Sequence, residues 1–178
     1  MMVDVTYQMV LSTLQTAGLL VGIFYYIMTL QNTRKNQQIQ LETRQAQLFM
    51  TLHIEDISQR ASESLDIMMN LEYEDLEDFE SKYGLENNPE AHHLINFFTN
   101  YYEGIGVLVR HGYVDIGLVA ELSSGAIRVG WEKYKAMAYE ARSKYNWPRW
   151  SVEFEYLYDT MMDYARKHPE LKIIPDTT

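Results

Sequence analysis

The longest apolar stretch of the chain lies near its N-terminus. Residues 9–30 contain no charged side chain, and the second half, residues 17–30, is almost continuously hydrophobic. A helix of about 20 apolar residues can cross the hydrocarbon core of a bilayer. The stretch therefore predicts an N-terminal transmembrane anchor over residues 1–30. The alternative is a buried helix of a soluble bundle. A signal peptide fits less well, because Asp4 stands where positive charge is expected.

Polar and small residues of this stretch gather on one side of the predicted helix. At about 100° per residue they fall within, or at the edge of, an arc of roughly 100°. Lipid offers no hydrogen bonds, so polar side chains gain by facing another helix, and glycines let two backbones approach closely. Neutral polar residues near the lipid headgroups are the simpler alternative. The residues predicted to pack against a second membrane helix are Gln8, Ser12, Gln15, Gly18, Gly22 and Tyr26.

Helical periodicity continues through the rest of the chain. Residues 31–47 are polar and lack proline and glycine, so we expect them to extend the first helix as a stalk. Apolar positions at three- and four-residue steps predict amphipathic helices over residues 48–168, with no strand pattern. The predicted fold class is therefore all-α, with one N-terminal transmembrane helix followed by a cytoplasmic helical bundle. Residues 169–178 are expected to form a tail.

Capping residues and turn residues set the boundaries of these helices. One helix is expected from residue 48 to about residue 70, and a short one over residues 75–83. Asn88 followed by Pro89 is typical of a helix start, and Asp115 is placed to cap the helix after that.

Two further breaks are predicted toward the C-terminus. Residues 123–125, Ser-Ser-Gly, are a candidate interruption of the helix that follows Asp115. Pro148 is expected to open the last helix, because proline is favoured in the first turn. The buried face predicted for that last helix comprises Phe154, Leu157, Tyr158, Met161 and Ala165.

The net charge of −10 is concentrated in one segment. Residues 61–103 hold eleven acidic side chains and one basic side chain, Lys82. This acidity argues against nucleic acid as a partner, because phosphates require Lys and Arg. A basic partner surface would fit the segment. The simpler interpretation is a solvated helix face, since Leu76, Phe79 and Tyr83 recur at helical steps. The predicted acidic contact patch comprises Glu72, Glu74, Asp75, Glu77, Asp78 and Glu80.

The residue patterns of known metal and catalytic sites are missing from the sequence. Glu90 and His93 form one Glu-x-x-His step, whereas di-iron bundles need two such steps and two more glutamates. The chain has no cysteine and no His-Glu-x-x-His pattern for zinc, and no glycine-rich phosphate loop. We therefore predict no metal, no cofactor and no catalytic residue, and interpret the protein as non-catalytic.

Glu103 is the strongest candidate for a functional carboxylate. It lies in an otherwise apolar helical stretch, close to Gly106. A buried glutamate needs a cationic partner, for which Arg110 and Arg128 are the candidates. Such an arrangement would form a small pocket with a tuned carboxylate. The alternative is a structural ion pair or a solvent-facing position.

Flanking charges predict the orientation of the membrane helix. Only Asp4 and the amino terminus precede it, whereas Arg34, Lys35 and Arg44 follow it. Lys and Arg residues close to a span stay in the cytoplasm. We therefore expect a cell-membrane protein with its N-terminus outside and residues 31–178 in the cytoplasm. The absence of cysteine suits that reducing compartment.

Three segments carry a family resemblance. They are residues 96–119 (NFFTNYYEGIGVLVRHGYVDIGLV), 127–134 (IRVGWEKY) and 154–158 (FEYLY). Together with the N-terminal apolar stretch, they resemble an uncharacterised prokaryotic family of membrane-anchored helical proteins, known as a domain of unknown function. The resemblance covers roughly residues 10–165. It implies one membrane helix and a cytoplasmic helical domain, and it implies no activity.

These features together predict a single-pass membrane protein without catalytic activity. We expect it to act as an interaction, scaffold or regulatory subunit of a membrane complex. Its contacts would be membrane lipid and either further copies of itself or a partner membrane protein. Two alternatives remain open, namely a ligand-sensing or enzymatic helical domain with a pocket near Glu103, and a small oligomeric channel.

Overall fold

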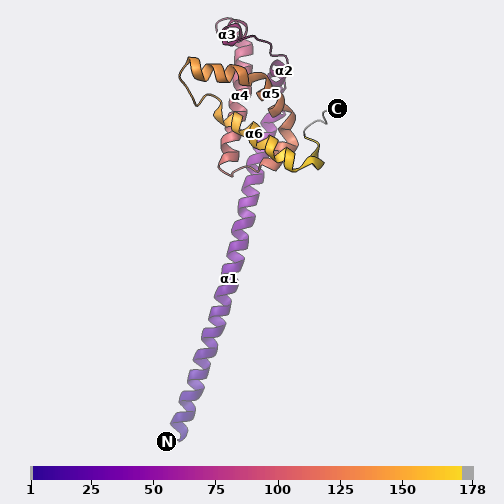
Figure 1. Ribbon diagram of the computed structural model, residues 1–178. Helices are drawn as coiled ribbons and strands as arrows, with labels where there is room; N and C mark the ends of the chain where they lie inside the picture. Colours follow the sequence, from indigo (N-terminus) through magenta and orange to yellow (C-terminus); the bar gives the residue numbers. More distant parts are fainter. Residues whose placement is uncertain (1, 174–178) are drawn as a thin grey trace. The chain divides into compact units, whose positions relative to one another are not determined.

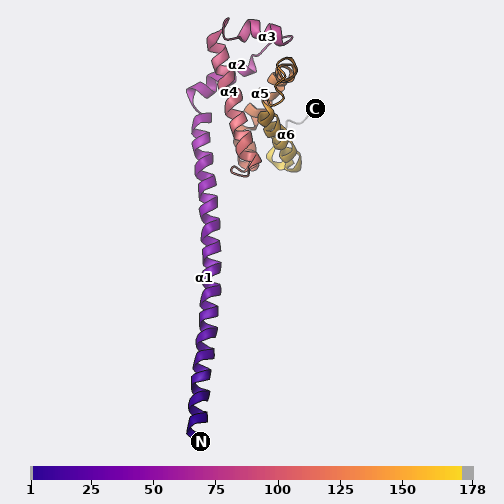
Figure 2. The same ribbon diagram turned by 90° about the vertical axis from the view of Figure 1, so that its left-hand side faces the viewer.

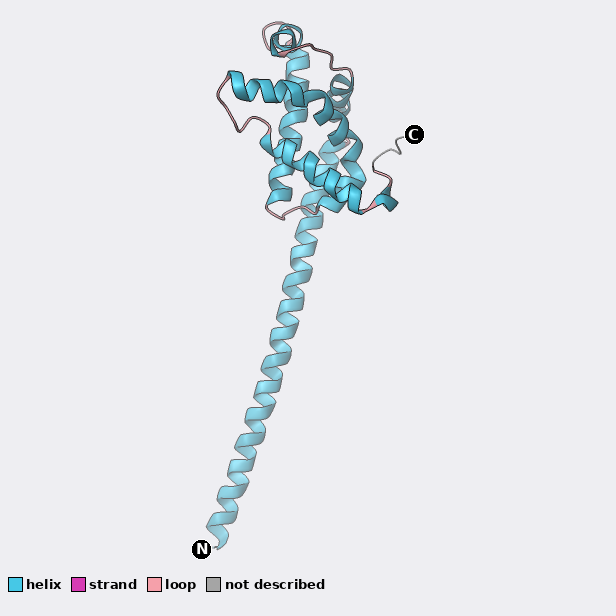
Figure 3. Cartoon of the chain, in the orientation of Figure 1, coloured by secondary structure: helices cyan, strands magenta, loops and turns pink. Residues whose placement is uncertain are grey.

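The computed structural model describes residues 2–173, and that part of the chain contains helices and no strands (Figures 1 and 3). The all-helical class predicted from the sequence is therefore confirmed. The elements are α1 (Met2–Asp56), α2 (Gln59–Met69), α3 (Leu76–Tyr83), α4 (Pro89–Arg110), α5 (Ile116–Lys144), α6 (Val152–Lys167) and a short 3₁₀ turn (Pro169–Leu171).

The chain divides into two compact units, Met1–Arg44 and Gln45–Thr178. The described part of the first unit is helical throughout, and each side chain from residue 7 to residue 44 is exposed. Within residues 2–173, α1 is the one helix that is long and apolar enough to cross a membrane. The helix also continues without a break through residues 31–44, as the lack of proline and glycine there predicts.

The core of the second unit is built around α4, α5 and α6. Helix α4 packs against α6 and α2, and α5 packs against α6 and α2 (Figures 1 and 2). Aromatic rings fill the centre, where Phe154 stacks on Tyr102 and meets Trp131 edge-on. All three rings are buried, and large buried aromatics contribute strongly to the stability of a core.

The single helix expected over residues 48–70 is wrong, because the chain turns between α1 and α2. Asp56, the last residue of α1, accepts hydrogen bonds from the hydroxyls of Tyr102 (2.8 Å) and Ser123 (2.7 Å). Ile57 is 68% exposed in the turn, and Ser58 caps α2 by accepting the Ala61 N–H (3.1 Å). Side chains distant in sequence therefore fix the position at which α1 ends, and Ser58 caps the start of the next helix.

The predicted caps of α4 and α5 are confirmed. The side-chain oxygen of Asn88 accepts the Ala91 N–H (3.2 Å), and Asp115 accepts the Gly117 N–H (2.8 Å). These bonds satisfy backbone donors that the first turn of a helix leaves free.

The two breaks predicted near the C-terminus are wrong. Helix α5 runs through residues 123–125 without interruption, because the Ser123 hydroxyl bonds to Asp56 and does not compete for the local backbone. Helix α6 begins at Val152, so Pro148 lies in the turn that precedes it. The buried face of α6 is as predicted for Phe154, Leu157, Met161 and Ala165, whereas Tyr158 is only half-buried.

Candidate functional site

Some polar side chains of the first unit donate hydrogen bonds to the backbone of their own helix, and others do not. Thr13, Thr16 and Thr29 each donate to the backbone carbonyl four residues earlier, at 2.8–2.9 Å. Among residues 7–173, whose side chains the structure describes, the predicted packing residues Gln8, Ser12 and Gln15 form no such side-chain bond, and all three are exposed. These three residues of the predicted stripe therefore have polar groups available for contact with a second helix.

The glycines of the stripe leave open space beside the helix. A Cβ added to Gly18 or Gly22 would meet nothing within 4 Å. Tyr26, one turn beyond Gly22, is also exposed. Glycine is unfavourable inside a helix by about 0.5–1 kcal/mol relative to alanine, so nothing within the first unit itself explains the two glycines.

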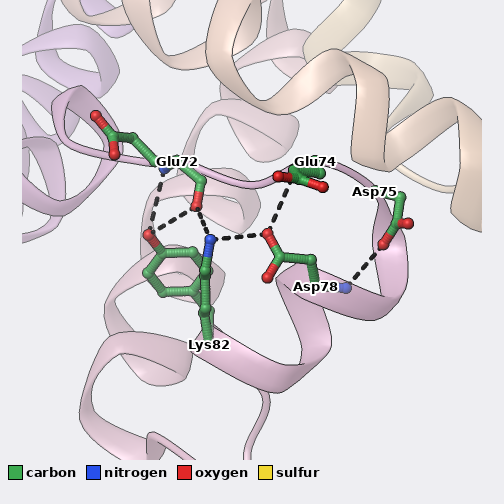
Figure 4. A network of polar contacts seen from close by, with 6 residues as sticks. Glu72, Glu74, Asp75, Asp78 and Lys82 are labelled. Carbon is green, nitrogen blue, oxygen red and sulfur yellow. Dashed lines mark hydrogen bonds and ion pairs between the residues drawn. The ribbon is translucent and has the colours of Figure 1, made fainter.

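The acidic segment over residues 72–80 is partly used by its own fold (Figure 4). Asp75 caps α3 by accepting the Asp78 N–H at 2.8 Å. The Asp78 carboxylate in turn accepts hydrogen bonds from the Lys82 ammonium (2.8 Å) and from the Glu74 N–H (3.0 Å). These two bonds lower the pKa of Asp78. Both aspartates therefore stabilise the start of α3.

Glu80, the last acid of the segment, bonds to residues at the C-terminal end of α5. Its carboxylate accepts the Tyr145 hydroxyl and pairs with the Lys144 ammonium at 3.5 Å. By contrast, Glu72, Glu74 and Glu77 are exposed, and their carboxylates form no bond within residues 2–173. These three glutamates are therefore the members of the predicted acidic contact patch whose carboxylates remain available to a partner.

Glu103 caps a helix other than its own. Its Oε2 accepts the N–H of Phe154, in the first turn of α6, at 2.7 Å. Ser151, in the cap position of α6, has a positive φ of 52° and makes no side-chain cap bond. The carboxylate from α4 thus satisfies a backbone donor that α6 cannot satisfy locally.

The predicted arginine partners of Glu103 are wrong. Arg110 pairs with Glu153, with 2.5 Å between Nε and Oε2, and Arg128 pairs with Glu132 at 3.8 Å. Glu103 is half-buried, and burial is the main cause that raises its pKa. The sequence indicated an unusual glutamate correctly, but the groups it meets belong to α6.

Stability is therefore expected to depend on the protonation of Glu103. Its raised pKa means that the folded chain holds this proton more tightly than the unfolded chain does. Ionisation at a pH above the ordinary value of 4.5 thus costs stability, and the loss is complete once the pH exceeds the raised value. Relative to Glu103→Gln, which cannot ionise, wild-type stability should fall as the pH rises from the ordinary value of 4.5 through the raised pKa of Glu103.

Urea unfolding at a series of pH values measures this difference. The exposed Glu121→Gln is the matched control, because it removes one carboxylate elsewhere on the second unit. A difference between wild type and Glu103→Gln that stays constant, or that grows in favour of the wild type with rising pH, would contradict the prediction.

An apolar cavity of about 530 Å³ opens between α3, α4, α5 and the turn before α6. Sequence reasoning did not predict it. The sequence feature that could have indicated this cavity is the pair of tryptophans on either side of Pro148, Trp147 and Trp150. From the sequence alone, these tryptophans are interpreted as packing in a turn. The cavity is lined mainly by apolar and aromatic side chains, namely Leu76, Phe79, Ile95, Tyr134, Met137, Tyr145, Trp147 and Trp150, and by the polar residues Glu80, His92 and Asn96.

A smaller cavity of about 260 Å³ adjoins the apolar one. The two cavities share Asn96, Tyr134, Trp147 and Trp150 in their walls. Glu103 lines the smaller cavity together with Arg149, so a hollow does lie beside this glutamate. Arg110 and Arg128 are not among its lining residues.

The comparisons with known proteins give one family and no relatives. The sequence model of the family described as "Domain of unknown function (DUF4760)" matches residues 12–161. No curated protein and no solved structure matches the chain. The match covers most of the sequence, including α1 from residue 12 onward, helices α2 to α5 and the first part of α6. The chain therefore belongs to the family described as a domain of unknown function, DUF4760.

Proposed function

We propose that the protein is a single-pass membrane protein and acts as a non-catalytic interaction or regulatory subunit of a membrane complex. In this proposal α1 crosses the cell membrane with the N-terminus outside and the second unit in the cytoplasm. The stripe of Gln8, Ser12, Gln15, Gly18, Gly22 and Tyr26 contacts a second copy of the same helix.

The observation that carries the proposal is the exposure of the apolar side chains of α1. Residues such as Leu20, Ile23 and Phe24 are each more than half exposed, and no charged residue lies among residues 9–30. Contiguous exposed apolar surface of this extent is rare in soluble monomers. A bilayer would cover it, and the unbonded polar groups would then favour contact with another helix.

In the described part of the second unit, the acidic side chains favour an interaction role over catalysis. Within residues 2–173 no group of three or more His, Asp or Glu side chains is placed to hold a metal ion. Three carboxylates at the start of α6, those of Glu103, Glu153 and Glu155, are each bonded within the fold. The free glutamates Glu72, Glu74 and Glu77 would suit a basic surface of a cytoplasmic partner.

Cysteine accessibility tests the membrane location and the orientation together. The natural chain has no cysteine, so Thr6→Cys and Ser143→Cys each introduce a single reporter thiol. In intact cells, a membrane-impermeant maleimide should label the cysteine at position 6 and label the one at position 143 only after the cells are opened. Carbonate extraction should leave both variants in the membrane pellet.

Two outcomes would overturn this part of the proposal. Release of the full chain into the soluble fraction would exclude a membrane span. Labelling at position 143 in intact cells, with protection at position 6, would reverse the orientation.

A further inference from the structure

The apolar cavity between α3, α4, α5 and the turn before α6 has the properties of a small-molecule site. Its volume of about 530 Å³ lies inside the range of about 300–1,000 Å³ typical of ligand pockets. Such pockets combine apolar and aromatic walls with a few polar groups, and this cavity does so. All its lining residues lie in the second unit, so one unit suffices to form it.

Aromatic side chains at the edge of the cavity are left incompletely covered. Trp147 is 57% exposed and Tyr145 is 46% exposed. Both pack against Trp150, Trp147 edge-on at 5.4 Å and Tyr145 in a stacked arrangement at 6.0 Å. Trp150 is itself fixed, because its indole N–H donates to the Tyr134 hydroxyl at 3.0 Å. A flat apolar molecule in the cavity would bury surface that the aromatic rings now expose.

The charged groups around the cavity already have partners in the protein. Glu80 is bonded to Tyr145 and Lys144, and Arg149 in the adjoining cavity pairs with Glu153 at 3.3 Å. A charged ligand would lose its hydration, and the one carboxylate in the wall of the apolar cavity, Glu80, is already bonded to Tyr145 and Lys144, so the loss is costly. A neutral ligand avoids that cost.

One polar group of the wall is left with free bonding capacity. The Asn96 amide donates to His92 Nε2 at 2.7 Å, and His92 Nδ1 bonds to the Tyr83 carbonyl at 3.3 Å. The side-chain oxygen of Asn96, Oδ1, accepts no hydrogen bond from the side chains and backbone that the structure describes, and Asn96 lines both cavities. A hydroxyl or amide N–H of a ligand could donate to this oxygen.

We propose that this cavity binds a neutral, mainly aromatic small molecule that carries a hydrogen-bond donor directed at Asn96. The aromatic body lies against Phe79, Met137 and Trp147, and the polar end lies toward the smaller cavity. This site adds a ligand to the second unit and does not depend on the membrane orientation of α1.

Photolabelling with three related probes tests the charge and the location of the ligand. The neutral probe is 4-hydroxybenzophenone at a pH below its phenol pKa, the anionic probe is 4-benzoylbenzoate, and the cationic probe is (4-benzoylbenzyl)trimethylammonium. The full chain is held in phosphatidylcholine nanodiscs, irradiated, digested and mapped by mass spectrometry. Methionine side chains react well with excited aryl ketones, so Met137 reports the cavity. Met69 reports the solvent-exposed surface, and Met28 reports the apolar part of α1.

The neutral probe should label Met137 saturably and about tenfold more than either charged probe, which corresponds to about 1.4 kcal/mol. Labelling of Met28 and Met69 should rise linearly with probe concentration. Trp147→Ala should reduce labelling of Met137 several-fold, because it removes one aromatic wall. Its matched control is Tyr113→Ala, an equally exposed aromatic (57%) that does not line the cavity. Circular dichroism spectra should show that both variants remain folded.

The alternative outcomes decide against the site. Linear labelling of Met137, or labelling no greater than at Met69, would show that the cavity has no affinity for the probe. Equal or stronger labelling by a charged probe would overturn the assignment of a neutral ligand. Equal loss of labelling in Tyr113→Ala and Trp147→Ala would show that the label does not report the cavity.

Discussion

Replacing Gly106 by alanine is expected to destabilise the second unit by about 2–3 kcal/mol. A Cβ at this position would lie 2.1 Å from the backbone oxygen of Glu153 and 2.6 Å from its carbonyl carbon. Backbone atoms cannot rotate away, so α4 and α6 would have to separate. That shift would also weaken the bond from Phe154 N–H to Glu103, and it would disturb the packing of Phe154 against Tyr102.

Gly104→Ala is the matched control, two residues earlier on the same helix. A Cβ there would meet nothing within 4 Å, and Gly104 is exposed. Alanine should therefore stabilise α4 by about 0.5–1 kcal/mol through helix propensity alone. Thermal unfolding followed by circular dichroism compares the two variants. A Gly106→Ala protein as stable as Gly104→Ala would show that α4 and α6 are not in close contact at this point.

Replacing Gly18 and Gly22 together by valine is expected to weaken self-association of the membrane helix about tenfold. An added Cβ at either glycine would meet nothing within 4 Å apart from its chain neighbours and the adjacent helix backbone, so the substitution meets no other part of the described chain. Any effect must therefore come from contact with another molecule. Valine side chains would keep the two backbones apart and would separate the amides of Gln8 and Gln15 from their partners.

Energy transfer between two differently labelled preparations, diluted with lipid, measures this association. Ala17→Val adds the same kind of branched side chain on the side of the helix opposite Tyr26, and we expect it to associate as the wild type does. Equal weakening in Ala17→Val and in the double variant would show a general effect of bulk. A wild-type chain that is monomeric at all dilutions would exclude self-association through this stripe.

Much of the local structure could be predicted from neighbouring residues. Asn88 with Pro89, and Asp115, mark helix starts because their side chains bond to backbone groups two or three residues away. The apolar face of α6 follows in the same way from periodicity over a few turns. Such interactions involve residues close in sequence, so the sequence contains both partners.

The errors share a different cause. The end of α1 at Asp56 depends on Tyr102 and Ser123, which lie 46 and 67 residues away. The same serine was the reason to expect an interruption of α5. Likewise, Glu103 was assigned to arginines on the basis of charge, whereas its partner is a backbone N–H of α6. No pattern of neighbouring residues reports such a donor.

The sequence by itself determined the all-helical class, the long apolar helix at the N-terminus and the concentration of acidic residues in one segment. These properties follow from composition and from periodicity along the chain. Only the tertiary structure decided the role of Glu103 as a cap, the separation of bound acids from free ones and the cavity beside Trp147. Each of these depends on which helices pack together, because its atoms come from segments that only the fold brings into contact.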